Sequence, residues 1–270
     1  MNETLRKRII TAVILGLALA IIILFLPAIA TVIALTLSVL AGAWEWSAFL
    51  RVSSTAWRAG YVAALAALMI VVWQLASTPG GRHLVLTAAL VWWMGALVWV
   101  ALAPQRVSPW SAALAGAMAL LPAWLALVYM RAQMAHGAQW IMFTLLLVFA
   151  ADIGAFFAGH RFGRLRLAPH VSPGKTWEGV LGGAAAGALV ALLGGTWFGL
   201  PLGTFVPLCI AVVGFSIVGD LTESLLKRFA GLKDSGTLFP GHGGIMDRID
   251  SVTGAAPVLL LGLTALGVTA

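Results

Sequence analysis

The chain has 270 residues, of which 61% are hydrophobic and 9% charged, with a formal net charge of +7. An average soluble domain carries about 25% charged residues, so this chain lacks the polar side chains to cover a water-exposed surface of its size. The composition therefore excludes an ordinary soluble protein and predicts an all-α, polytopic transmembrane helical bundle. Lysine and arginine on loops facing anionic lipid account for the positive charge. Because no basic stripe with interleaved aromatic residues occurs, nucleic-acid binding is not expected.

About nine segments are long and apolar enough to cross a bilayer. They cover residues 9–26, 28–49, 59–76, 84–103, 110–130, 139–159, 178–199, 203–223 and 252–269. The first follows Arg6-Lys7-Arg8 and precedes Ala28-Ile29-Ala30, as in a signal peptide, but its length favours a membrane span. Only Pro27 separates it from the second, so the two form either a tight hairpin or one broken helix.

With nine spans, the basic residues sort to one side of the membrane. That side receives Arg6, Lys7, Arg8, Arg51, Arg58, Arg106, Arg161, Arg164, Arg166, Lys175, Lys227, Arg228, Lys233 and Arg248, and the other side receives only Arg82 and Arg131. Lysine and arginine are enriched in cytoplasmic loops. We therefore expect a multi-pass protein of the cell (inner) membrane with a cytoplasmic N-terminus, an outside C-terminus and its polar site facing the cytoplasm.

Acidic residues concentrate in the second half of the chain. Of the nine carboxylates, only Glu3 and Glu45 precede residue 150. This predicts a hydrophobic transmembrane scaffold over residues 1–137 and a transmembrane catalytic region over residues 138–270. The single cysteine, Cys209, excludes an intramolecular disulfide and a cysteine-based metal cluster. Small residues at 182–187 fit close helix packing, either within the bundle or in a homodimer.

Asp152 lies inside the sixth expected span, where an ionisable side chain is costly and faces a polar cavity or a partner. The segment Ser172-Pro173-Gly174-Lys175-Thr176-Trp177-Glu178-Gly179 begins the seventh. Its Gly-Lys-Thr is not a P-loop, because position 169 is proline where that motif needs glycine, and no strand is expected before it. Lys175 and the N–H groups of a helix N-terminus can still hold a phosphate. The alternative is a cationic loop capped by Ser172 or Thr176.

The eighth span ends in a polar helix face. Asp220, Glu223, Ser224 and Lys227 recur at i, i+3, i+4, i+7 spacing, so they share one side of the helix. On a soluble helix, Glu223 and Lys227 form an ordinary i, i+4 ion pair. At the membrane edge an exposed polar face is unfavourable, which favours a polar cavity.

The densest polar motif covers residues 233–250. It contains Lys233-Asp234, the turn His242-Gly243-Gly244 and, at an expected helix start, Asp247-Arg248-Ile249-Asp250. Asp247 and Asp250 share a helix face, and paired carboxylates suit Mg²⁺, which keeps waters and substrate phosphates in its shell. A Ser-His-Asp hydrolase is possible on paper, but its nucleophile elbow is missing.

Residues 224–250 resemble the signature of the phosphatidate cytidylyltransferase (CDP-diacylglycerol synthase) family. The signature reads Ser-x-x-Lys-Arg, four residues, Lys-Asp, then Pro-Gly-His-Gly-Gly-x-x-Asp-Arg-x-Asp. It is matched without departure by Ser224, Lys227-Arg228, Lys233-Asp234, Pro240-Gly241-His242-Gly243-Gly244 and Asp247-Arg248-Ile249-Asp250. Segments 152–163 and 171–179 are similar to flanking motifs, although His160 stands where a basic residue is expected. About the last 120 residues carry the resemblance, and the first half matches only as a bundle of spans.

The resemblance implies transfer of CMP from CTP to phosphatidate in the bilayer, giving CDP-diacylglycerol and pyrophosphate. A phosphatidate oxygen is expected to attack the α-phosphorus of CTP in line, without a covalent enzyme intermediate. Asp220, Asp247 and Asp250 are the expected ligands of Mg²⁺, with a second cation left open, and together with Lys227 they form the expected catalytic set. The expected substrate-binding residues are Asp152, Lys175, Glu223, Ser224, Arg228, Lys233, Asp234, His242, Gly243, Gly244 and Arg248.

Two other functions fit parts of the pattern. A CTP-dependent polyprenol kinase would use the γ-phosphate of CTP and release CDP instead of pyrophosphate. An ion-coupled transporter would also place Asp152 and Asp220 at membrane depth. It needs an aqueous path to both sides, whereas nearly all polar residues sort to one side and no internal repeat is evident.

Overall fold

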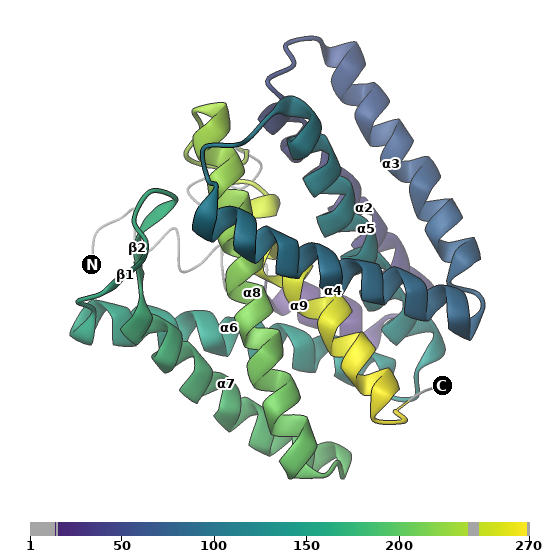
Figure 1. Cartoon of the computed structure of the whole chain (residues 1–270). Coiled ribbons are helices and arrows are strands. Elements are labelled where there is room, and N and C mark those ends of the chain that lie inside the picture. The colour runs from purple at the N-terminus through teal and green to yellow at the C-terminus, as the bar shows by residue number, and fades with distance from the viewer. Residues whose placement is uncertain (1–13, 15, 237–242, 269–270) are drawn as a thin grey trace.

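The computed structural model of the chain describes residues 14, 16–236 and 243–268, and it is predominantly helical (Figure 1). After the short helix Gly16–Phe25, the order is α2 (Ala28–Trp46), the 3₁₀ helix η1 (Ser47–Leu50), α3 (Thr55–Leu75), α4 (Pro79–Leu102), α5 (Pro109–Gln133), α6 (Gly137–Phe162), β1 (Arg166–Ala168), β2 (Ser172–Thr176), α7 (Trp177–Phe198), α8 (Leu202–Ala230) and α9 (Met246–Ala265). The expected all-α membrane bundle is confirmed.

Seven helical segments of the described chain are long and apolar enough to cross a membrane. They are Ala28–Leu50, which joins α2 and η1, and the six helices from α3 to α8. These seven correspond to the second to eighth expected spans. Of the first expected span, the structure describes a helix over Gly16–Phe25, while residues 1–13 and 15 lie outside the described part. The total of nine spans and the membrane orientation stay predictions.

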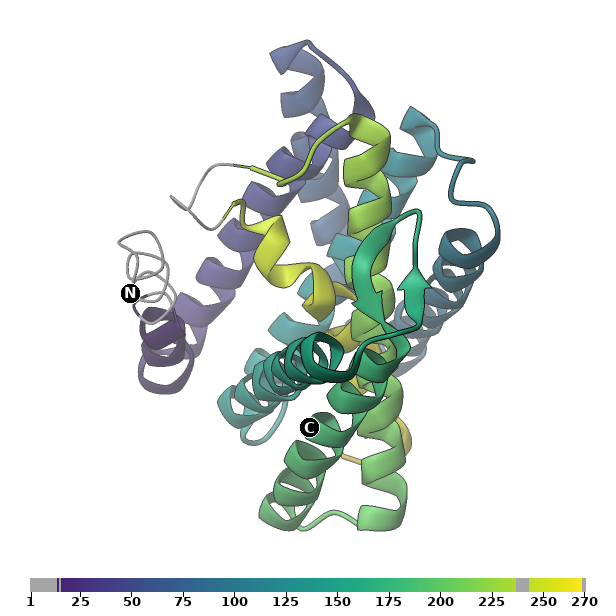
Figure 2. The same cartoon turned by 90° about the vertical axis from the view of Figure 1, so that its left-hand side faces the viewer.

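The last helix differs from the expected ninth span. The sequence predicts an apolar helix over 252–269, whereas α9 begins at Met246 and is not among the seven candidate spans. Residues 251–260 are all buried. They pack against helices that include α8, α5 and α4, and Figure 2 shows α9, in yellow, among the other helices. The apolar side chains in the middle of α9 therefore face protein.

The two halves of the chain share one hydrophobic core. One buried cluster combines Leu86 and Met130 from the first half with Val212 and Leu259 from the second. The division into a scaffold over 1–137 and a catalytic region over 138–270 stays a prediction, and the packing of α4 and α5 on α9 crosses that boundary.

A short β-hairpin interrupts the helices, which corrects the expectation that no strand precedes Gly174-Lys175-Thr176. Strand β1 pairs antiparallel with β2, and Gly174-Lys175-Thr176 lies within β2. The P-loop interpretation still fails, because this segment is a strand instead of a phosphate-wrapping loop. Thr176 caps α7, with its Oγ1 accepting the N–H of Gly179 at 3.1 Å, so Thr176 is the cap of the two residues named in the alternative interpretation, and Ser172 lies in β2.

Four of the segments that the charge distribution assigns to one side lie together at one end of the bundle. Arg51, Gln105, His170 and Arg228 come from four separate segments and line one pocket there. Trp57 and Trp110 are 74% and 86% exposed. They lie in the first turns of α3 and α5, the helices that follow the loops of Arg51 and Gln105. Exposed tryptophans of this kind are typical of a membrane–water interface.

Candidate functional site

The polar face predicted for the end of α8 is present. Ser224 Oγ donates a hydrogen bond to Asp220 Oδ1 at 3.2 Å, and Lys227 Nζ donates to Glu223 Oε2 at 2.8 Å. The side chains of Glu223 and Lys227 are only 1% and 13% exposed. This ion pair is therefore internal, unlike the surface pair that the same spacing gives on a soluble helix, and breaking an internal pair is costly.

Helix α9 crosses this face at a point where both helices carry glycine. A Cβ placed on Gly219 of α8 would lie 2.5 Å from the backbone oxygen of Asp250, and one placed on Gly254 of α9 would clash with the backbone oxygen of Phe215. Small residues let the two backbones approach this closely. As a result, Asp250 lies beside Asp220 and Glu223, whose negative charges act on it.

Asp247, in the first turn of α9, is surrounded by donors. Its Oδ1 accepts from Lys227 Nζ at 2.7 Å, and its Oδ2 accepts from the N–H of Ser235 at 2.9 Å, the hydroxyl of Ser235 at 2.9 Å and the N–H of Gly244 at 2.8 Å. Burial alone would raise the pKa of Asp247, but the hydrogen bonds from Lys227, Gly244 and Ser235 outweigh it and hold the pKa below its usual range. This carboxylate links α8 to the segment before α9.

Glu45 of α2 completes the site, and the sequence reasoning missed it. Its carboxylate accepts the N–H of Ile245 at 3.0 Å and the N–H of Met246 at 2.9 Å, and the residue is 8% exposed. Glu45 Oε2 lies 2.9 Å from Ser235 Oγ, whose single hydroxyl proton it shares with Asp247 Oδ2. Glu45 therefore caps the N-terminus of α9. The signal was available, because Glu45 lies within the expected span 28–49 just as Asp152 lies within 139–159.

Glycine is required at two positions before α9, for a different structural reason at each. Gly243 has φ of +79°, a left-handed conformation that glycine adopts without strain. A Cβ on Gly244 would clash with the carboxylate of Glu45 and the hydroxyl of Ser235. The predicted glycine turn is thus tied to Glu45 and Asp247 by its backbone. His242, the third residue predicted for this turn, lies outside the described residues.

Lys175 reaches α8 from the β-hairpin. Its Nζ lies 2.6 Å from Asp220 Oδ2. Both residues line a pocket of about 550 Å³, here called the hairpin pocket, together with Asp152, His160 and Arg166. The pocket lies where α6, α7 and α8 meet, because glycines let α6 and α7 approach: a Cβ on Gly154 would lie 2.6 Å from the backbone oxygen of Gly182. The small residues of α7 thus serve packing inside the bundle.

Four predicted substrate-binding residues are exposed. Arg228 is exposed and lines the pocket at the end of the bundle instead of the hairpin pocket. Lys233 and Asp234 are exposed in the segment between α8 and α9, and Arg248 is exposed in the first turn of α9. Arg228 follows Lys227 directly, and successive helix residues point in different directions, so the two cations of the Lys-Arg pair reach different places.

The residues present fit a divalent cation that is shared with a phosphate ligand. Buried Glu223 Oε1 accepts no hydrogen bond from a donor among the described residues, and its neighbour is the carboxyl of Asp250. No three acidic, histidine or cysteine side chains in the described part of the chain form a metal-holding group, and Asp247 is already occupied by donors. Mg²⁺ usually takes one or two carboxylates and completes its shell with water and phosphate oxygens.

Comparisons with known proteins agree on one family. A sequence profile described as the cytidylyltransferase family matches residues 6–266. A phosphatidate cytidylyltransferase of Pseudomonas aeruginosa is 44% identical, with 97% of this chain and 98% of the relative aligned. A phosphatidate cytidylyltransferase of Haemophilus influenzae is 36% identical over 94% of this chain and 96% of its own length. The similarity therefore extends through the first half, where the motifs alone gave no match.

Proposed function

The chain belongs to the cytidylyltransferase family, and on this premise we propose that it transfers CMP from CTP to phosphatidate, giving CDP-diacylglycerol and pyrophosphate. The observation that carries the proposal is the cluster where α8, α9 and the hairpin meet, which sets Lys175 and Lys227 against Asp220, Glu223 and Asp247. Acidic groups to hold a metal and ammonium groups to hold phosphate are what a nucleotide and a phospholipid headgroup require. The apolar bundle around the cluster suits a lipid substrate.

The reaction is a single displacement at phosphorus. A phosphatidate oxygen forms a bond to the α-phosphorus of CTP while the bond from that phosphorus to the bridging oxygen of the β-phosphate breaks, and pyrophosphate leaves with the electron pair. Asp220 and Asp250, with Glu223 beside them, would hold Mg²⁺, which would offset negative charge on the nucleotide phosphates.

The two lysines have different tasks. Lys175 stands in the hairpin pocket next to Asp220, and its ammonium group can move from that carboxylate to a phosphate oxygen when substrate enters. Lys227 is held between Glu223 and Asp247, so it fixes the cluster and offsets its negative charge. Catalysis then rests on positioning and electrostatics.

The same proposal places the protein in the cell (inner) membrane with the cluster towards the cytoplasm. The support is the gathering of basic loops at one end of the bundle and the need for CTP. A homodimer is compatible with this arrangement, and its test is the mass of the purified protein in a mild detergent.

The test is turnover of purified protein with phosphatidate, CTP and Mg²⁺. CDP-diacylglycerol and pyrophosphate should appear in equal amounts, whereas CDP with a phosphorylated alcohol would identify a polyprenol kinase instead. Asp250→Asn should lower kcat about 100-fold or more, since it removes a negative charge that would hold Mg²⁺. Glu178→Gln is the matched control, because Glu178 accepts the N–H of Leu165 and does not line the hairpin pocket. Failure of wild-type protein to turn over in several detergents and in bilayers would overturn the proposal.

A further inference from the structure

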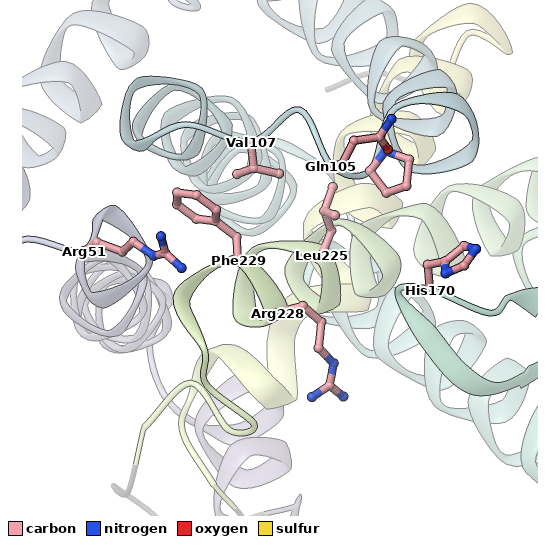
Figure 3. A pocket seen from close by; sticks show the side chains of 8 residues that line it. Arg51, Gln105, Val107, His170, Leu225, Arg228 and Phe229 are labelled. Carbon is pink, nitrogen blue, oxygen red and sulfur yellow. The ribbon is translucent and has the colours of Figure 1, made fainter.

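A second pocket lies at the end of the bundle where the basic loops gather. It has a volume of about 510 Å³, and we call it the end pocket. Arg51, Gln105, His170, Leu225, Arg228 and Phe229 line it, and Figure 3 shows these side chains around the last turns of α8. Its size is that of pockets that hold a small ligand or a headgroup.

The end pocket is separate from the hairpin pocket. A buried apolar cluster contains Val171, Leu221 and Leu225 and packs against Leu167 and Ile217. Leu225 lines the end pocket, whereas Leu167 and Ile217 line the hairpin pocket. The same apolar cluster thus forms the wall between them, and a group bound in the end pocket does not meet the carboxylates of Asp220 and Asp250.

Two arginines line the end pocket from opposite segments, and Figure 3 shows the side chain of Arg228 directed away from Gln105 and Val107. Arg51 follows η1, and Arg228 lies in the last turn of α8. Among the described residues, neither guanidinium forms an ion pair with an acidic side chain. Arg51 is held in place by Phe229, with its guanidinium carbon 4.2 Å from the centre of that ring. Two cations that line one concave place attract an anion to it, and the packing on Phe229 holds one of them there.

The chemistry of the lining groups selects a phosphoryl group. Guanidinium groups match the oxygens of phosphate with paired hydrogen bonds, and Gln105 and His170 add donors that carry no fixed negative charge. The exposed rings of Trp57 and Trp110 lie on helices that begin at the same end, which places the pocket at the level of lipid headgroups. Phosphoryl anions are concentrated at that level by the membrane itself.

We propose that the end pocket is an accessory site for a phosphoryl anion, occupied by the headgroup of an anionic phospholipid and distinct from the site of CMP transfer. Arg51 and Arg228 bind the phosphate oxygens, and Gln105 and His170 contact the rest of the headgroup. The apolar wall separates the end pocket from the carboxylates of the transfer site. Binding in the end pocket is therefore measured as retention of lipid, an assay that needs no CMP transfer.

The experiment uses full-length protein in phosphatidylcholine nanodiscs that contain increasing amounts of phosphatidylglycerol. Native mass spectrometry counts the phosphatidylglycerol molecules that stay bound, and a second series offers inorganic phosphate and pyrophosphate without anionic lipid. Arg51→Gln and Arg228→Gln should each weaken lipid retention about fivefold, and the double variant by more. Arg106→Gln is the control, because Arg106 is an exposed cation of the same end that does not line the pocket.

The outcomes separate cleanly. Weaker lipid retention in the arginine variants, with Arg106→Gln unchanged, supports a lipid headgroup. Weaker binding of inorganic phosphate or pyrophosphate alone supports a phosphoryl site filled from solution. Equal retention of every probe by wild type and the double variant overturns the proposal. Arg51 has a φ of +55°, so a substitution there can disturb folding. Arg228→Gln changes an exposed position and tests the proposal even if Arg51→Gln does not fold.

Discussion

The carboxylate of Glu45 ties the first half of the chain to the site, so Glu45→Gln is the most informative single change. Glutamine has the same length, but one of its two terminal groups is a donor. In either orientation that NH₂ group faces a backbone N–H, of Ile245 or of Met246, whereas the hydroxyl of Ser235 can turn to accept from it. The substitution therefore removes a charge and at least one hydrogen bond from the start of α9.

The size of the effect follows from those contacts. A hydrogen bond to a charged group contributes about 1.5–3 kcal/mol, and a buried donor left without a partner costs about as much. We expect Glu45→Gln to lower the free energy of unfolding by about 2–3 kcal/mol. Because α9 carries Asp247 and Asp250, we also expect kcat to fall by up to about 100-fold, as displacements on the order of 1 Å do.

Denaturant titration in detergent, followed by tryptophan fluorescence, measures the first quantity, and release of pyrophosphate measures the second. Glu45→Asp keeps the charge and should give a smaller loss than Glu45→Gln. Glu178→Gln removes a carboxylate that accepts the N–H of Leu165 at the hairpin, and it should leave the α9 start intact. Wild-type unfolding and wild-type kcat in Glu45→Gln would refute the reasoning.

Two further predictions concern the ion pairs. Lys227→Met removes the ammonium group that donates to both Glu223 and Asp247 and should lower the free energy of unfolding by about 3–5 kcal/mol. Lys233→Met, at an exposed position, should not, and equal unfolding curves for the two variants would contradict this. Because the pKa of Asp247 is held below its usual range, its stabilising contribution is present at neutral pH and is lost as pH falls through that lowered pKa. The free energy of unfolding, measured from pH 7 downwards, should therefore fall less steeply with acid in Asp247→Asn than in the wild-type protein.

Three local features of this protein were predictable from its sequence, and one was not. The face formed by Asp220, Glu223, Ser224 and Lys227 follows from helical spacing, which the backbone fixes whatever the partner. The glycine turn and the cap at Thr176 follow equally from neighbours in the chain. The β-hairpin was missed because three and five residues in two short strands give too little alternation to stand out.

Composition alone determined that this chain is surrounded by lipid and folds mainly into helices. In hydrocarbon, backbone N–H and C=O groups must be paired within the protein, and helices pair them. Which side chains meet was decided by the tertiary structure. The contacts of Glu45 span 190 to 201 residues, and they depend on how α2 and α9 pack, which no local pattern encodes. Likewise, the spacing of Asp247 and Asp250 suggested equal roles, yet the crossing at Gly219 and Gly254 sets Asp250 among carboxylates, while Asp247 is enclosed by donors.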